Sequence, residues 1–167
     1  MEVKNRIKEL RQVPASQLKK NACNWRIHSE YQLDVLKAII EEVGFAGAVI
    51  ARELADGSLE IIDGHARVKL AGDEEIPVLV LDVNEAEAKK ILATYDPISA
   101  LADTDSEQLN ALLNEVEVSN QSIVQLFEQL KTKAESYAQE APADFKEFNE
   151  EIETNRVCPK CGYRWSE

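Results

Sequence analysis

The spacing of apolar residues in the first part of the chain predicts one well-defined helix. After Ser29, apolar side chains recur every three or four residues as far as Val43, which is the period of an amphipathic helix. Ser29 and Gln32 form a capping-box pair at its start, and Gly44 closes it in a left-handed conformation. Further upstream, residues 4–13 predict either a short strand or a helical turn.

Three apolar runs predict strands. Residues 48–51 and 59–62 flank Asp56-Gly57, a pair that favours a hairpin turn, so these two strands should lie antiparallel. Residues 76–81 form the third strand. Its Pro77 suits either an edge strand or the beginning of a strand, because proline has no N–H to donate to a neighbour.

Helical spacing returns in the second half of the chain. Asn84, with a glutamate three positions on, predicts the start of a helix that ends before Pro97. Thr104 or Asp105 caps a second helix, and a third begins near Asn120. The order of elements predicts an α+β fold, in which a small mixed sheet with packed helices precedes a helical extension.

Composition divides the chain into four parts. Residues 1–100 hold the strands and their helices, and residues 101–133 form the helical extension. Acidic residues then dominate residues 134–155, which predicts a linker that is either mobile or weakly helical. Residues 156–167 form a short tail that contains a Cys-x-x-Cys motif.

The overall composition predicts a protein with one core and no membrane span. The chain has 167 residues, 44% of them hydrophobic, and no apolar run long enough to cross a bilayer. The N-terminus lacks the apolar stretch of a signal peptide, and three cysteines do not make a disulfide framework. We therefore expect a cytoplasmic protein in a reducing compartment.

The net charge of −12 argues against broad, non-specific affinity for DNA, which needs many basic side chains against phosphates. The acidic excess is largest in residues 101–167, which hold 14 acidic and 6 basic residues. Any DNA contact must therefore be local. The candidate is an N-terminal basic cluster, with an ordinary solvated surface as the alternative interpretation: Lys4, Arg6, Lys8, Arg11, Lys19, Lys20 and Arg26.

The junction between the strand at residues 59–62 and the helix after it is the main candidate for chemistry. Gly64 makes the turn, and the first backbone N–H groups of the new helix then lack partners. Those donors and the positive end of the helix dipole favour an anion, which His65 and Arg67 can also face. The pattern predicts a phosphate-binding turn, and an ordinary turn with solvated side chains is the alternative.

Three segments in this order resemble the ParB N-terminal domain of the ParB/sulfiredoxin superfamily, in the form found in phage and mobile-element proteins. They are an asparagine-rich box that ends in arginine (residues 21–26), the capped helix (residues 33–44), and the strand and turn (residues 61–67) followed by Ile76-Pro77-Val78. The resemblance covers residues 5–100, and the helices after Asp105 also resemble the tail of that family.

The resemblance implies a small domain with a nucleotide pocket. In the superfamily, the glycine turn binds the phosphates of a nucleoside triphosphate, which is CTP in ParB clamps and ATP in sulfiredoxin. On this chain, Gly64 would let a phosphate approach the backbone, and His65 and Arg67 would hold it. Asn24 and Arg26, from the first segment, would reach the same pocket.

The chain also departs from these relatives. ParB clamps carry Gly-Glu-Arg-Arg where this chain has Gly64-His65-Ala66-Arg67, and sulfiredoxin needs a reactive cysteine at the place of Gly64, which excludes its usual chemistry. Clamps hold magnesium with a Glu-Asn pair. Near the position that corresponds to this pair, the present chain has Tyr95-Asp96. Asp96 is therefore either a candidate magnesium ligand or a turn cap. The helices of residues 104–130 are too acidic for a DNA-recognition helix-turn-helix.

The tail resembles one half of a zinc ribbon. A Cys-x-x-Cys turn directs Cys158 and Cys161 at one metal, but tetrahedral zinc needs four ligands. We expect the missing pair to come from a second chain in a homodimer, with Cys23, His28 and His65 as the other candidates. The alternatives are a reduced tail without metal and a redox pair, although redox pairs usually stand at the start of a helix.

Three functions remain open at this point. The first is a ParB-like module that binds a nucleotide, associates with DNA in phage or plasmid DNA metabolism, and acts as an adaptor for a partner such as a DNA methyltransferase. The second is an enzyme, either a nucleoside triphosphatase or a ParB-like nuclease, although no dense acidic cluster for two metals is visible. The third is a zinc-dimerised structural protein with a degenerate pocket.

Overall fold

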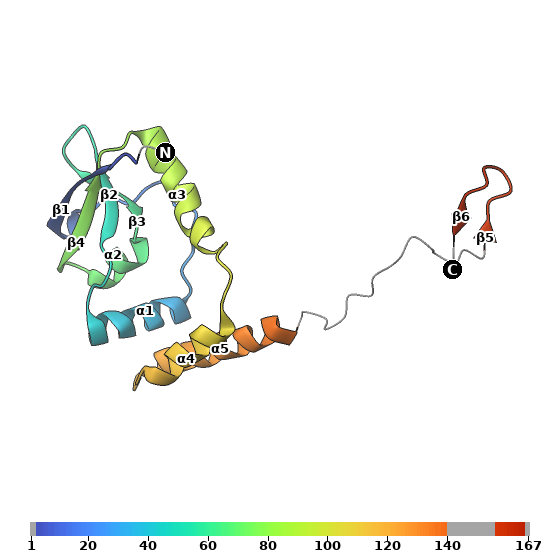
Figure 1. Cartoon of the computed structure of the whole chain (residues 1–167). Coiled ribbons are helices and arrows are strands. Elements are labelled where there is room, and N and C mark those ends of the chain that lie inside the picture. The colour runs from blue at the N-terminus through green and yellow to red at the C-terminus, as the bar shows by residue number, and fades with distance from the viewer. Residues whose placement is uncertain (1–2, 140–155, 166–167) are drawn as a thin grey trace.

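A four-stranded mixed sheet forms the centre of the N-terminal part of the molecule (Figure 1). The computed structural model describes residues 3–139 and 156–165. The strand order is β1-β4-β2-β3, in which only β2 and β4 are parallel to each other. The four strands are β1 (Ile7–Pro14), β2 (Val49–Glu53), β3 (Leu59–Asp63) and β4 (Glu75–Leu81).

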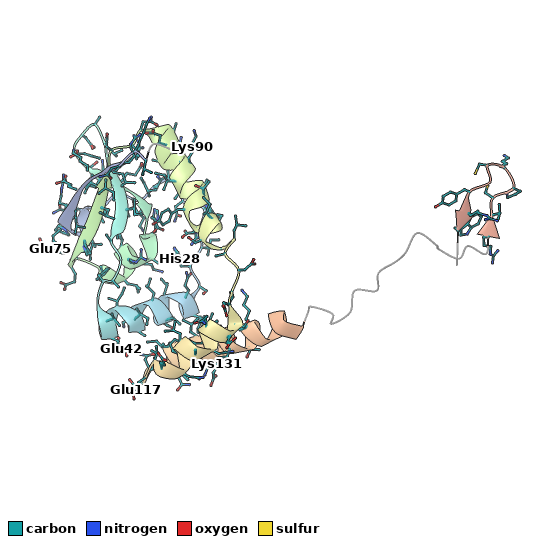
Figure 2. All side chains as sticks on the ribbon, in the orientation of Figure 1. His28, Glu42, Glu75, Lys90, Glu117 and Lys131 are labelled. Atoms are coloured by element: carbon teal, nitrogen blue, oxygen red, sulfur yellow. The ribbon has the colours of Figure 1, made fainter. Side chains whose placement is uncertain are left out.

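Helices follow the strands in the order predicted, which confirms the α+β class. In Figure 1, α4 and α5 lie side by side below α1, at a distance from the sheet. Lys131 on α5 donates to Asn114 on α4 at 3.0 Å, and Lys131 is labelled in Figure 2. The helices are the 3-10 turn η1 (Ala15–Gln17), α1 (Glu30–Val43), α2 (His65–Ala71), α3 (Glu85–Ser99), α4 (Ser106–Glu115) and α5 (Gln121–Gln139).

Both faces of the sheet are covered, because alternate residues of a strand point to opposite sides. Ile61 packs on the side of η1 and α2, whereas its neighbour Ile62 packs on the side of α3 with Ile50 and Ala88. Ile61 is fully buried, and burial of one such side chain contributes about 1.5–3 kcal/mol. The hairpin predicted at Asp56-Gly57 joins β2 to β3 and brings the chain to the site described below.

The helix starts are those predicted, with one difference. Asn84 forms the complete capping box with Glu87. Ser29 accepts from the backbone of Gln32 at 3.2 Å, but the Gln32 side chain contacts the ring of His28 at 3.1 Å. The second half of that capping box is therefore absent. Asp105 caps α4, which decides between the two residues proposed for that position.

Two expectations about prolines are corrected. Pro77 lies on an interior strand, since β4 pairs with both β1 and β2, so the edge interpretation is wrong. It is tolerated because parallel pairing with β2 begins only at Val78. Pro97 does not end α3, which continues to Ser99. Only two residues of α3 follow Pro97, so the distortion that the proline ring causes affects little of the helix.

Helix α5 extends beyond residue 133, where the sequence predicted a linker, and ends at Gln139. Ala134 is almost fully buried, and its carbonyl accepts from the Ser106 hydroxyl on α4 at 3.1 Å. Packing of α5 on α4 therefore holds this first part of the predicted linker in a helix. The rest of the predicted linker, residues 140–155, lies outside the described residues.

A separate antiparallel pair closes the described part of the chain: β5 (Arg156–Val157) and β6 (Arg164–Trp165). Within residues 3–139 and 156–165, no helix is long and apolar enough to cross a membrane.

Candidate functional site

A cavity of about 460 Å³ lies where four elements meet: the loop before α1, α1 itself, the turn from β3 into α2, and the end of α3. Helix α5 adds one residue, Leu126. His28, labelled in Figure 2, belongs to the loop that leads into α1 and lines this cavity. All six residues predicted for nucleotide and magnesium also line it: Asn24, Arg26, Gly64, His65, Arg67 and Asp96.

Gly64 adopts a left-handed conformation at the start of α2, with φ of 98° and ψ of 19°. A Cβ atom at this position would lie 3.1 Å from the Val49 side chain and 3.3 Å from its Cα. Both the conformation and the close approach to β2 therefore require glycine. Because α2 runs only from His65 to Ala71, its dipole is short, and side chains must supply most of the attraction for an anion.

Burial favours the neutral form of His65. It is half-buried, and burial lowers its pKa from the ordinary 6.5, with Asp63 acting in the opposite direction. Its Nε2 accepts from the backbone N–H of Asn21 at 3.4 Å. This hydrogen bond implies that the ring proton is on Nδ1, where it can be donated to a ligand.

The two cavity arginines are each opposite an aspartate. Arg26 Nη1 lies 2.8 Å from Asp96 Oδ2, and its guanidinium stands over the Trp25 ring at 5.3 Å. Arg67 Nη1 lies 3.7 Å from Asp63 Oδ2, a long separation for an ion pair and one that is worth little. Two positive charges and two negative charges therefore line the same cavity.

Asp96, the candidate magnesium ligand, is already engaged by Arg26. A metal at Asp96 would have to compete with that guanidinium. Among the described residues, no group of three or more histidine, cysteine or carboxylate side chains is arranged to hold a metal. A single carboxylate still fits magnesium, which commonly binds one or two carboxylates together with substrate phosphates and water.

Asn24 belongs to a turned loop. Its side-chain oxygen accepts from the backbone N–H of Arg26 at 3.4 Å, and its backbone N–H donates to the Asn21 carbonyl at 3.1 Å. The asparagine-rich box thus fixes the course of the chain from Asn21 to Arg26. The box presents Arg26 to the cavity from a short, hydrogen-bonded segment.

The sequence did not predict the apolar wall of this cavity. Val35, Leu36 and Ile39 on α1 line it, although their helical spacing suggested only core packing. The hydroxyl of Tyr31 is buried and has no hydrogen-bond partner in the described residues. A buried hydroxyl without a partner costs free energy, so it is a feature that a bound ligand can satisfy. The sequence did contain one indication of this wall, because Tyr31 and Val35 are one helical turn apart and so lie on the same face of α1.

The N-terminal basic cluster is largely paired with carboxylates. Arg6 makes two hydrogen bonds to the carboxylate of Glu87 at 2.8 and 3.0 Å. The basic cluster also contains ion pairs of Lys8 with Glu53, Arg11 with Glu9, Lys19 with Asp56 and Arg26 with Asp96. Lys19, with Ser58, holds the pKa of Asp56 well below its usual range. Most of this positive charge is thus neutralised within the chain before any DNA approaches.

The predicted zinc residues Cys158 and Cys161 lie in the turn between β5 and β6. Cys23, on the loop before α1, is exposed and free. Nothing in the described residues brings these cysteines, His28 and His65 into one metal site.

The mixed sheet, its covering helices and the glycine turn at the cavity define the class of domain to which the sequence pointed. The model of the ParB N-terminal domain matches residues 1–95. The chain therefore belongs to the ParB N-terminal domain family.

The proteins that are similar to this chain include a nucleoid occlusion protein and a chromosome-partitioning protein. The nucleoid occlusion protein of Geobacillus sp. (strain WCH70) is 31% identical over 87 residues, which cover 50% of this chain and 31% of that protein. This chain therefore spans less than a third of the length of that relative. The C-terminally truncated chromosome-partitioning protein ParB from Caulobacter crescentus, complexed with CTP-gamma-S, aligns with a TM-score of 0.55. It is 22% identical, and the alignment covers 71% of each chain, which shows a shared fold.

Proposed function

We propose that the cavity binds a nucleoside triphosphate together with magnesium, with CTP as the first candidate and ATP as the second. The observation that carries the proposal is the convergence of residues from positions 24 to 96 on one cavity, in a member of the ParB N-terminal domain family. A structural neighbour of this chain is complexed with CTP-gamma-S. The cavity volume also lies within the range of ligand pockets.

The residues divide the recognition of such a ligand among them. Arg67 supplies a guanidinium at the turn, and Gly64, which lines the same cavity, is the position where a phosphate would approach the backbone. His65 donates a neutral N–H from Nδ1. The apolar wall of α1, which includes Val35 and Leu36, suits the flat face of a base.

Magnesium is part of the proposal because of the charge balance. The two arginines of the cavity are offset by Asp63 and Asp96, so the cavity offers little net positive charge to a triphosphate. Magnesium when bound neutralises phosphate charge, and Asp96 is the residue assigned to it. Arg26, released from Asp96, would then turn to the phosphates.

Calorimetry with CTP and ATP, with and without magnesium, tests this function. We expect Arg67→Ala to weaken nucleotide binding by tenfold to a hundredfold, about the value of a charge-assisted hydrogen bond. Lys69→Ala is the matched control, because Lys69 lies on the same helix, is exposed, and does not line the cavity. A dissociation constant above about 1 mM for both nucleotides, or equal affinities of the two variants, would refute the proposal.

At the level of the cell, we propose that the protein is an adaptor associated with DNA in phage or plasmid DNA metabolism. Family membership supports this. Lys4 and Lys20 are exposed, and the described residues show no ion pair for either, so they are the members of the basic cluster available to DNA phosphates. A DNA-binding titration at two salt concentrations checks this. Lys4→Ala/Lys20→Ala should weaken binding and flatten its salt dependence, and an unchanged slope would count against the assignment.

A further inference from the structure

The Cys-x-x-Cys turn is held by the backbone on both sides. The N–H of Cys158 donates to the Tyr163 carbonyl at 2.8 Å, and the Cys158 carbonyl accepts from the N–H of Gly162 at 2.9 Å. Gly162 has a φ of 76°, which closes the turn in a conformation that favours glycine. The pairing of Arg156 with Trp165 continues the hairpin beyond these bonds. Cys158 is therefore fixed by its own backbone.

Cys158 and Cys161 both lie in this turn, three positions apart, and the two backbone hydrogen bonds of Cys158 close the turn around them. Both thiols are free. The arrangement presents two sulfur ligands to one point, as one half of a tetrahedral site requires.

The surroundings of the cysteines suit a metal better than redox chemistry. A redox pair usually stands at the start of a helix, whereas Cys158 and Cys161 lie between two strands. Residues 156–165 contain three basic residues and no acidic residue, in a chain of net charge −12. Zinc with four thiolates carries a net charge of −2, so this local positive charge is complementary to it.

The hairpin cannot complete such a site by itself. Zinc in a structural site takes four ligands, and the described residues of one chain offer no group of three. The hairpin also has little core of its own beyond the stacked rings of Tyr163 and Trp165, whose centroids are 6.2 Å apart. Small units of this kind usually need a metal or a partner.

We propose that Cys158 and Cys161 from two copies of this chain bind one zinc ion as four sulfur ligands and thereby join the two C-terminal hairpins. A two-fold axis supplies the missing pair from the same two residues of the second copy. As each sulfur–zinc bond forms, the thiol loses its proton to solvent, and no oxidant or reductant is involved. The proposal is independent of nucleotide binding at the cavity.

The test uses the whole 167-residue protein, purified without a metal-binding tag. We expect about half an equivalent of zinc per chain and a dimer by light scattering. A strong chelator should remove the zinc and give monomers, and added zinc should restore the dimer. Cobalt in place of zinc should give the absorption of a tetrahedral site with sulfur ligands.

Single substitutions of the three cysteines test which of them bind the zinc and hold the dimer together. Cys158→Ser and Cys161→Ser should each lose zinc and dimerisation, whereas Cys23→Ser, which changes the third cysteine, should keep both. Helix content by circular dichroism and calorimetry with CTP should stay unchanged in Cys158→Ser, because the cavity lies in residues 24–126. Three results would each overturn the proposal. They are a full equivalent of zinc in a monomer, zinc below about a quarter of an equivalent per chain, and a zinc-bound dimer of Cys158→Ser.

Discussion

Replacement of Gly64 by alanine tests the close contact between the glycine turn and the sheet. The substitution imposes two separate costs. The first is the left-handed backbone, which costs a residue with a Cβ about 1–2 kcal/mol. The second is the new Cβ, at 3.1 Å from a Val49 side-chain carbon and 3.3 Å from the Val49 backbone, a form of overpacking that costs about 1–3 kcal/mol. We therefore expect Gly64→Ala to lower the free energy of unfolding by about 2–5 kcal/mol.

Gly57 provides the matched control for this change. It also has a positive φ, of 80°, but a Cβ there would meet nothing within 4 Å. Gly57→Ala should therefore cost only the backbone part, about 1–2 kcal/mol. Urea denaturation followed by circular dichroism measures both variants. The difference between them isolates the contact with Val49, and equal losses in the two variants would show that this contact has no energetic weight.

Two further predictions concern charge in the cavity. Asp96→Asn removes the carboxylate 2.8 Å from Arg26. It should therefore strengthen nucleotide binding without magnesium by about fivefold and reduce the gain in affinity from added magnesium. Calorimetry measures the affinities with and without magnesium, and an unchanged ratio between them would place the metal elsewhere. The pKa of His65 is lower in the folded protein than the ordinary 6.5. As the pH falls, the unfolded chain therefore takes up a proton before the folded protein does. The free energy of unfolding consequently decreases below about pH 6.5. The midpoint of urea unfolding at pH 7.5 and 5.5 measures this loss, and His65→Gln should make it smaller; an equal loss in the two proteins would contradict the assignment.

Local patterns predicted the parts of the fold that depend on local interactions. The Asn84 cap and the turn at Gly64 depend on neighbouring residues, so they were visible in the sequence. Pro97 was misjudged because the rule that proline ends a helix does not consider how few hydrogen bonds remain in its last turn. Gln32 was misjudged because His28 competes for its side chain.

The charges of the site could not be predicted in the same way. The partners of Arg6 and Lys8 lie 81 and 45 residues away in the sequence. No local pattern links such residues, so the basic cluster looked like a free surface until the fold brought carboxylates to it. The ion pair of Arg26 with Asp96 is a contact of the same kind, and it changes the interpretation of both residues.

Leu126 on α5 has a consequence for where the functional unit ends. The family match stops at residue 95, yet part of the cavity wall comes from a residue 31 positions further on. A fragment cut at the family boundary would retain the sheet, the glycine turn and both cavity arginines, but it would lose Asp96 and leave the cavity open on the side of α5. Experiments that transfer this domain to another protein should therefore include the helical extension. The segment that matches the family is shorter than the segment that encloses the cavity.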